Sequence, residues 1–228
     1  PIDAMDTRPW NADLLDYLAT YLADHNYDLQ RVLRLIATSR AYQSSTAIVD
    51  EGDVTEEYRY QGPIAKRMTA EQFVDAVWQI TGAGPKKPHG KAAEFLSLSG
   101  DQASTAGKRY RASLVASDLL MRSLGRPNRE QVVTSRPPLL TTLQALDLSN
   151  SPTLVQTISE GAARHFADSS GQEGRDAVEA IYLAALSRAP TDDEREIATQ
   201  ILGDPSTKEG IEDLLWAVFM LPEFQIVR

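Results

Sequence analysis

The sequence predicts an all-α fold: a single irregular multi-helix bundle built of helical hairpins around a central segment rich in caps and turns. Apolar residues recur at the 3- and 4-residue spacing of amphipathic helices over much of the 228 residues. Capping residues precede these stretches, and glycine or proline follows them. Strand-like alternation is confined to the few residues around Arg59, too few to make a sheet.

Composition predicts a globular protein with a sizeable core, because 42% of the residues are apolar. We expect residues 1–228 to form one helical domain. The longest apolar run, Leu214–Pro222, has nine residues, whereas a membrane helix needs roughly 20, so no membrane span is expected. No initiator methionine or signal-like segment stands at Pro1, which predicts that the chain is a piece of a longer protein.

The cysteine count, the histidine positions and the net charge exclude several classes of functional site. The chain has no cysteine, which excludes disulfides, zinc fingers and covalent haem attachment. Its three histidines lie far apart, so no local metal-binding motif is present and no metal ligand is predicted. A net charge of −9 argues against nonspecific nucleic-acid binding, because neutralising phosphates requires a basic field.

The first predicted element is a helical hairpin. Asn11 caps a helix over LLDYLATYLADH, and Asp28 caps a second helix over LQRVLRLIATSRAYQ. The short loop between them predicts antiparallel packing. The positions expected in the core share one helix face: Leu14, Leu15, Leu18, Tyr21 and Leu22, then Leu29, Val32, Leu33 and Ile36.

A loop, a helix and an irregular stretch come next. Residues 44–62 lose the helical period and collect acidic residues, which predicts a solvated loop. Thr69 and Gln72 have the spacing of a capping box, and Gly82 stands where a helix ends. We expect residues 84–107 to form a flexible excursion, and a functional lid is the alternative interpretation.

The central segment, Asp118–Asn150, is a succession of caps, glycine and proline stops, with Thr141 or Thr142 capping a helix over LQALDLSN. Four amphipathic helices are predicted after it. The third of these helices follows the capping box of Thr191 and Glu194. For the other three, the residues expected to be buried are Leu154, Ile158, Ala162 and Phe166 in the first, Val178, Ile181, Tyr182 and Ala185 in the second, and Ile211, Leu214, Leu215 and Val218 in the last.

Basic residues concentrate between Lys108 and Arg136, where seven basic minus two acidic residues give +5 in a chain of −9. Guanidinium groups match the oxygens of carboxylate, sulfate or phosphate, and a helix N-terminus adds N–H donors. We therefore predict an oxyanion-binding site made of Arg126, Asn128, Arg129, Ser135, Arg136 and Thr142. The alternative is that these arginines pair internally with Glu71, Asp75 or Asp147. No nucleophile motif or glycine-rich phosphate loop is present, so no catalytic residue is predicted.

The segment LMRSLGRPNREQVVTSRPPLLTTLQALDLSN (Leu120–Asn150) resembles the large planctomycete family of unknown function found C-terminal to planctomycete-type cytochrome c domains. Further similar segments are WNADLLDYLA, LIATSRAYQSS, RMTAEQFVDAVWQITG, YLAALSRAPTDDE and LLWAVFMLPEF. The resemblance implies a bacterial, exported parent protein that is periplasmic or extracellular. It also implies that this chain is the C-terminal part of the family domain, that an upstream cytochrome c domain carries the haem, and an association with polysaccharide utilisation. No haem is expected in this chain itself.

Two function classes remain open. The first is a noncatalytic helical module that binds an acidic ligand, such as an acidic polysaccharide, or docks a partner among the upstream domains. The second is part of a redox or carbohydrate-active enzyme whose catalytic groups lie partly upstream. The first is favoured because anion-compatible spacing is present and catalytic spacing is not.

Overall fold

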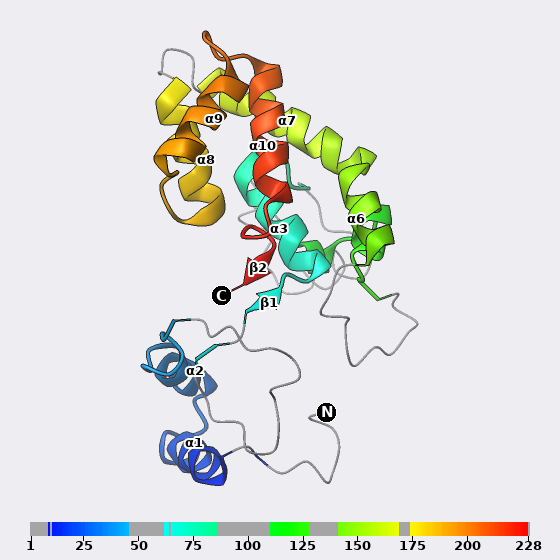
Figure 1. Cartoon of the computed structure of the whole chain (residues 1–228). Coiled ribbons are helices and arrows are strands. Elements are labelled where there is room, and N and C mark those ends of the chain that lie inside the picture. Colours follow the sequence, from blue (N-terminus) through cyan, green and yellow to red (C-terminus); the bar gives the residue numbers. More distant parts are fainter. Residues whose placement is uncertain are drawn as a thin grey trace, which may run out of the picture. The chain divides into compact units, whose positions relative to one another are not determined.

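The computed structural model describes residues 9, 11–45, 62–63, 65–85, 110–127, 141–168 and 174–227. The chain divides into two compact units, Pro1–Lys66 with Arg228 and Arg67–Val227, and each is described by itself. Within the described ranges there are nine α-helices, one 3-10 helix and a sheet of two short strands (Figure 1). The all-α prediction is confirmed. Of the predicted excursion over 84–107, only residues 84 and 85 lie within the described residues. The expectation of one domain over 1–228 stays a prediction.

The first unit contains a helical hairpin, α1 (Ala12–Asp24) and α2 (Leu29–Ala37). Both predicted caps are confirmed: the side chain of Asn11 accepts a hydrogen bond from the N–H of Leu14, and that of Asp28 accepts one from the N–H of Arg31. Each cap satisfies an amide at the helix start that has no partner within the helix.

The predicted core of this hairpin is mostly wrong. Only Val32 is buried, whereas the exposed fractions are 48% for Leu14, 55% for Leu15 and 55% for Leu33. Two helices share a single line of contact, so the outer positions of each apolar face remain at the surface. The hairpin therefore presents apolar side chains outward.

The second helix also ends earlier than the prediction, at Ala37 instead of continuing to residue 43. The hydroxyl of Thr38 donates to the carbonyl of Arg34, and the hydroxyl of Ser39 donates to that of Ile36. Side-chain donors that take up the last carbonyls compete with continued helix, which accounts for the early end.

The second unit, whose boundary with the first falls within β1, holds the remaining elements. They are β1 (Lys66–Arg67), α3 (Ala70–Thr81), η3 (Ala112–Leu114), α5 (Leu119–Ser123), α6 (Thr142–Ser149), α7 (Pro152–Asp168), α8 (Gly174–Leu186), α9 (Asp192–Leu202), α10 (Lys208–Met220) and β2 (Ile226–Val227). The predicted capping boxes at Thr69 and Thr191 are both present. Gly82 ends α3 in the left-handed conformation with φ 68°, as expected for this position.

The core of this unit is organised around α10, which packs against α7, α8 and α9 (Figure 1). Its predicted apolar face is confirmed, since Ile211, Leu214, Leu215 and Val218 are all buried. Phe219 is also fully buried, and its ring lies 4.9 Å from that of Phe224. The face predicted for α8 is likewise largely buried, whereas Phe166 on α7 is 43% exposed and was wrongly expected in the core.

A close approach of two backbones joins α3 to α7. Thr81 is 1% exposed, and a Cβ atom built on Gly161 would lie 2.5 Å from the Thr81 Cβ and 2.9 Å from its Cα. The Thr81 hydroxyl donates to the carbonyl of Val77, so its polar atom is satisfied within α3. Glycine at position 161 therefore sets the spacing of these helices.

Candidate functional site

The predicted oxyanion site is only partly within the described structure. Asn128, Arg129, Ser135 and Arg136 lie outside the described residues. Arg126 and Thr142 lie inside them, at the two ends of the stretch that carries the other four. These ends are close in the fold, because α5 and α6 pack against each other.

Arg126 is directed into the protein, with only 14% of its side chain exposed. Its guanidinium donates to three carbonyls that surround η3, those of Ala112 at 2.9 Å, Ser113 at 3.3 Å and Val115 at 3.1 Å. Its Nε lies 3.6 Å from a carboxylate oxygen of Glu71 on α3. Five N–H groups in a planar fork suit such a set of acceptors. Arg126 thus ties the 3-10 turn to α3, which is the internal pairing named as the alternative.

A second arginine of the basic stretch also meets α3. Arg111 forms an ion pair of 3.3 Å with Asp75, and the other Asp75 oxygen accepts the N–H of Ala112 at 2.6 Å. The Arg111 side chain is largely exposed, so its pairing contributes little to stability. The hydrogen bond from the Ala112 N–H to Asp75 matters more for the local structure, because it fixes the start of η3.

At the other end of the stretch, Thr141 and not Thr142 caps α6. The Thr141 hydroxyl accepts from the N–H of Gln144, and the Gln144 side chain accepts from the N–H of Thr141. Thr142 is the first helical residue and is exposed. Its position at a helix N-terminus is compatible with the predicted supporting role, although part of the donor set there is used within the capping box.

The strongest ionic cluster among the described residues was not singled out from the sequence. Arg188, after α8, makes bidentate contacts of 2.7 and 2.8 Å with Glu194 and contacts Glu223 at 2.8 Å. Its guanidinium carbon lies 5.8 Å from the centre of the Tyr182 ring. We call these residues the Arg188 clamp. The capping box at Thr191 was a visible signal for Glu194, but nothing local predicted that Glu223, which follows α10, would join it.

The clamp shifts the titration of its members. The hydrogen bonds from Arg188 lower the pKa of Glu194 to about 2, against the opposing effect of burial, and Thr191 adds a smaller lowering. Burial and then the Glu194 charge raise the pKa of Tyr182. All three charged side chains are about one-third exposed, so water screens the clamp. The clamp joins the end of α8 to the start of α9 and to the residues after α10. The N–H groups of the Arg188 guanidinium are taken up by these contacts.

Acid should weaken this clamp. The folded pKa of Glu194 lies near 2 and the ordinary value is 4.5. Its contribution to stability is therefore fully present above pH 4.5 and is lost as pH falls towards 2. We expect Glu194→Gln to lower the urea midpoint at pH 7 and to converge with the unmodified chain near pH 2. Glu196→Gln on the exposed face of the same helix is the control, and an equal effect of both variants would contradict a specific role of the clamp.

A serine, a lysine and a glutamate meet between α7 and α10. The Ser159 hydroxyl donates to Glu212 at 2.8 Å and accepts from the Lys208 ammonium at 3.1 Å, which also pairs with Glu212 at 2.9 Å. The hydrogen bonds from Lys208 and Ser159 lower the pKa of Glu212, and a carboxylate with a lowered pKa is a weak base. The contacts of Ser159 on α7 with Lys208 and Glu212 on α10 therefore tie two helices together.

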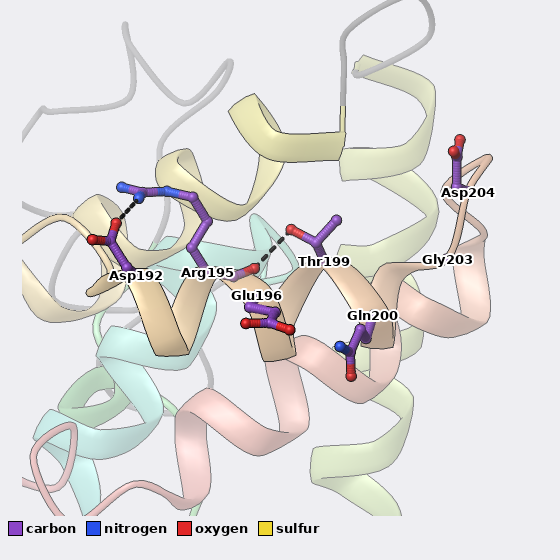
Figure 2. Close-up of a pocket in the computed structure, with 7 residues that line it drawn as sticks. All are labelled: Asp192, Arg195, Glu196, Thr199, Gln200, Gly203 and Asp204. Atoms are coloured by element: carbon purple, nitrogen blue, oxygen red, sulfur yellow. Dashed lines mark hydrogen bonds and ion pairs between the residues drawn. The ribbon is translucent and has the colours of Figure 1, made fainter.

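The described surface includes the following two hollows. The α9 hollow, about 770 Å³, is lined by Asp192, Arg195, Glu196, Thr199, Gln200, Gly203 and Asp204. Figure 2 shows Arg195 turned back to Asp192, with which it pairs at 2.8 Å, and Thr199 donating to the Arg195 carbonyl. The lining has three acidic residues and one basic residue, so its net charge is negative, and it comes from α9 and the turn after it. Among the described residues, no group of three or more His, Cys, Asp or Glu side chains is arranged to hold a metal ion.

The hairpin hollow, about 500 Å³, lies between α1 and α2 and is lined by Tyr21, Asp28, Gln30, Arg31, Arg34, Leu35 and Thr38. Two arginines and one aspartate give this lining a net positive charge, in contrast to the α9 hollow. From the sequence, α2 was predicted only as a packing helix, and this pair was missed. Its signal was the three-residue spacing of Arg31 and Arg34, which places both on one helix face.

Comparisons with known proteins give a family and no described activity. A family model described as "PSD1: Protein of unknown function (DUF1553)" matches residues 2–202. No curated protein and no solved structure matches the chain. Over the described residues, every helix is too short or too polar to cross a bilayer.

Proposed function

Because the chain belongs to the PSD1 family of proteins of unknown function (DUF1553), we propose a function from its own residues: a noncatalytic helical module that binds an acidic ligand. The observation that carries this proposal is the charge contrast of the stretch Lys108–Arg136, at +5 by seven basic minus two acidic residues, in a chain of −9. A localised basic field in an acidic protein attracts anions to that place.

The described residues on both sides of this stretch support a binding site there. Arg126 anchors the chain before residue 128, and the Thr141 capping box fixes it after residue 140. The residues that flank Arg129 and Arg136 in the sequence are thereby held at two packed helices, α5 and α6. We assign Arg129 and Arg136 to the ligand, with Asn128, Ser135 and Thr142 as supporting donors, and we assign Arg126 to anchoring.

The resemblance of Leu120–Asn150 extends this proposal to the parent protein. The module belongs to an exported planctomycete protein, periplasmic or extracellular, whose upstream cytochrome c domain holds the haem. Its ligand is an acidic polysaccharide, or a carboxylate or sulfate group of one. The outward apolar side chains of the α1–α2 hairpin favour a second role in docking a partner domain, since exposed apolar patches mark protein contacts.

The test of ligand binding replaces the two proposed ligand arginines. Arg129→Gln with Arg136→Gln should weaken binding of a sulfated oligosaccharide by at least about tenfold, because each charged hydrogen bond contributes roughly 1.5–3 kcal/mol. Calorimetric titration at physiological salt measures this loss, and the uncharged oligosaccharide is the ligand control. The exposed Arg122→Gln is the matched protein control. A large fall in the melting temperature with unchanged binding would contradict the proposal and favour internal pairing.

A second experiment separates the module from the enzyme alternative. The full-length parent protein is titrated with candidate glycans while its haem spectrum is recorded. Saturable binding without haem reduction supports the module. Glycan-dependent haem reduction would instead place this chain in a redox enzyme.

A further inference from the structure

The hairpin hollow carries two arginines, Arg31 and Arg34, that differ from the four described arginines paired with a carboxylate. Arg111, Arg126, Arg188 and Arg195 each pair with a carboxylate. Within the described part of the chain, the guanidinium groups of Arg31 and Arg34 make no ion pair and no hydrogen bond. Both are exposed, and both line the same concave surface.

Hydrogen bonds at both ends of α2 hold the backbone of these two arginines in place. Asp28 caps α2 through the N–H of Arg31, and the Thr38 hydroxyl donates to the Arg34 carbonyl at 2.8 Å. The helix between these caps presents residues three apart on one face. On the opposite wall, the Tyr21 ring is held against His25, with ring centres 4.0 Å apart. The hollow is therefore formed by anchored elements on both sides.

The charge of the hollow selects an anion. Asp28 is the single acid among its described lining residues, and one of its oxygens already accepts the N–H of Arg31 at 3.1 Å. Two guanidinium groups outweigh this one carboxylate, and the Gln30 amide adds an uncharged donor. Like charges three residues apart on one helix face repel each other, and a doubly charged anion bound by both offsets that repulsion.

We infer that the hairpin hollow is a binding site for a doubly charged tetrahedral oxyanion, a sulfate or phosphate group, held by Arg31 and Arg34 with Gln30 in support. This deepens the proposed function, on which it rests for the class of ligand, and places a second anion site in the first unit of the chain. Two separate sites in one chain suit a ligand that carries several anionic groups, because linked contacts raise the effective concentration at the second site.

The inference is tested by NMR on the full chain, through the Nε–H signals of its arginines. Sodium sulfate, sodium phosphate and sodium chloride are compared at equal ionic strength. The signals of Arg31 and Arg34 should move and saturate with sulfate or phosphate and not with chloride. A response to only one of the two oxyanions also supports the inference and shows which of them the hollow prefers. Equal responses to all three salts would overturn the inference, because general screening does not distinguish the anions.

Variants separate this site from the one proposed above. Arg31→Gln with Arg34→Gln should weaken sulfate or phosphate binding to the hairpin by at least about tenfold, with Arg40→Gln as the exposed control on the same unit. If this double variant keeps the affinity, the hairpin site is refuted. If Arg129→Gln with Arg136→Gln leaves the hairpin signals responsive, the two sites are independent, and a failure of one is not a failure of the other.

Discussion

Replacing Gly161 by alanine is expected to lower the free energy of unfolding by about 2 kcal/mol, because the new methyl group has no room. Its Cβ would lie 2.5 Å from the Thr81 Cβ and 2.9 Å from the Thr81 Cα. The second of these atoms is backbone, so α3 itself must move away from α7. Alanine favours helix over glycine by roughly 1 kcal/mol, which offsets only part of this cost. Urea unfolding measures the change, and a fall in melting temperature of about 4–8 °C should accompany it.

The matched control is Gly174→Ala at the start of α8. There the nearest atom to an added Cβ is the Leu202 Cδ1 at 3.9 Å, an ordinary contact. This variant should leave stability unchanged or raise it slightly. Thr81→Ala combined with Gly161→Ala provides a second check, because the smaller residue removes part of the clash and should recover part of the loss. Equal stability of the Gly161 and Gly174 variants would contradict the close helix approach.

The sequence predicted the second unit better than the first for a physical reason. In the second unit, apolar faces such as that of α10 are enclosed by several helices, so periodicity and burial agree. In the first unit, the same periodicity in α1 meets one partner helix, and Leu14 and Leu15 stay about half exposed. Periodicity shows which side of a helix is apolar. It does not show how many neighbours will cover that side.

Caps were predictable because they are local. The caps at Asn11 and Asp28 and the capping boxes at Thr69 and Thr191 depend on residues at most three positions apart, and each is found in the structure. Long-range pairs were not predictable in the same way. Arg188 meets Glu223, 35 positions later, only because the chain after α10 returns to the end of α8. The partner of the Arg126 side chain could not be predicted for the same reason, because the sequence is compatible both with an anion site and with pairing to acids within the protein.

Replacing Arg126 by glutamine is expected to lower the free energy of unfolding by about 3 kcal/mol, the second large effect. Its guanidinium donates to the carbonyls of Ala112 and Val115 at 2.9 and 3.1 Å and lies 3.6 Å from Glu71. Hydrogen bonds from a charged group contribute roughly 1.5–3 kcal/mol each, and glutamine reaches at most part of this set. Thermal and urea unfolding measure the loss, with Arg122→Gln as the exposed control, for which a change within about 0.5 kcal/mol is expected.

The same variant decides what Arg126 does, because anchoring and ligand binding predict opposite patterns. If Arg126 anchors the loop, Arg126→Gln lowers stability, and Arg126→Lys restores little of it, since an ammonium cannot reproduce the planar fork that spans η3 and Glu71. If Arg126 binds the ligand directly, the glutamine variant keeps its melting temperature and loses sulfated oligosaccharide binding. In that case lysine restores part of the affinity, because it returns the charge. The contacts with three backbone carbonyls favour the first pattern: they occupy the guanidinium of Arg126, whereas Arg129 and Arg136 are the arginines proposed for the ligand.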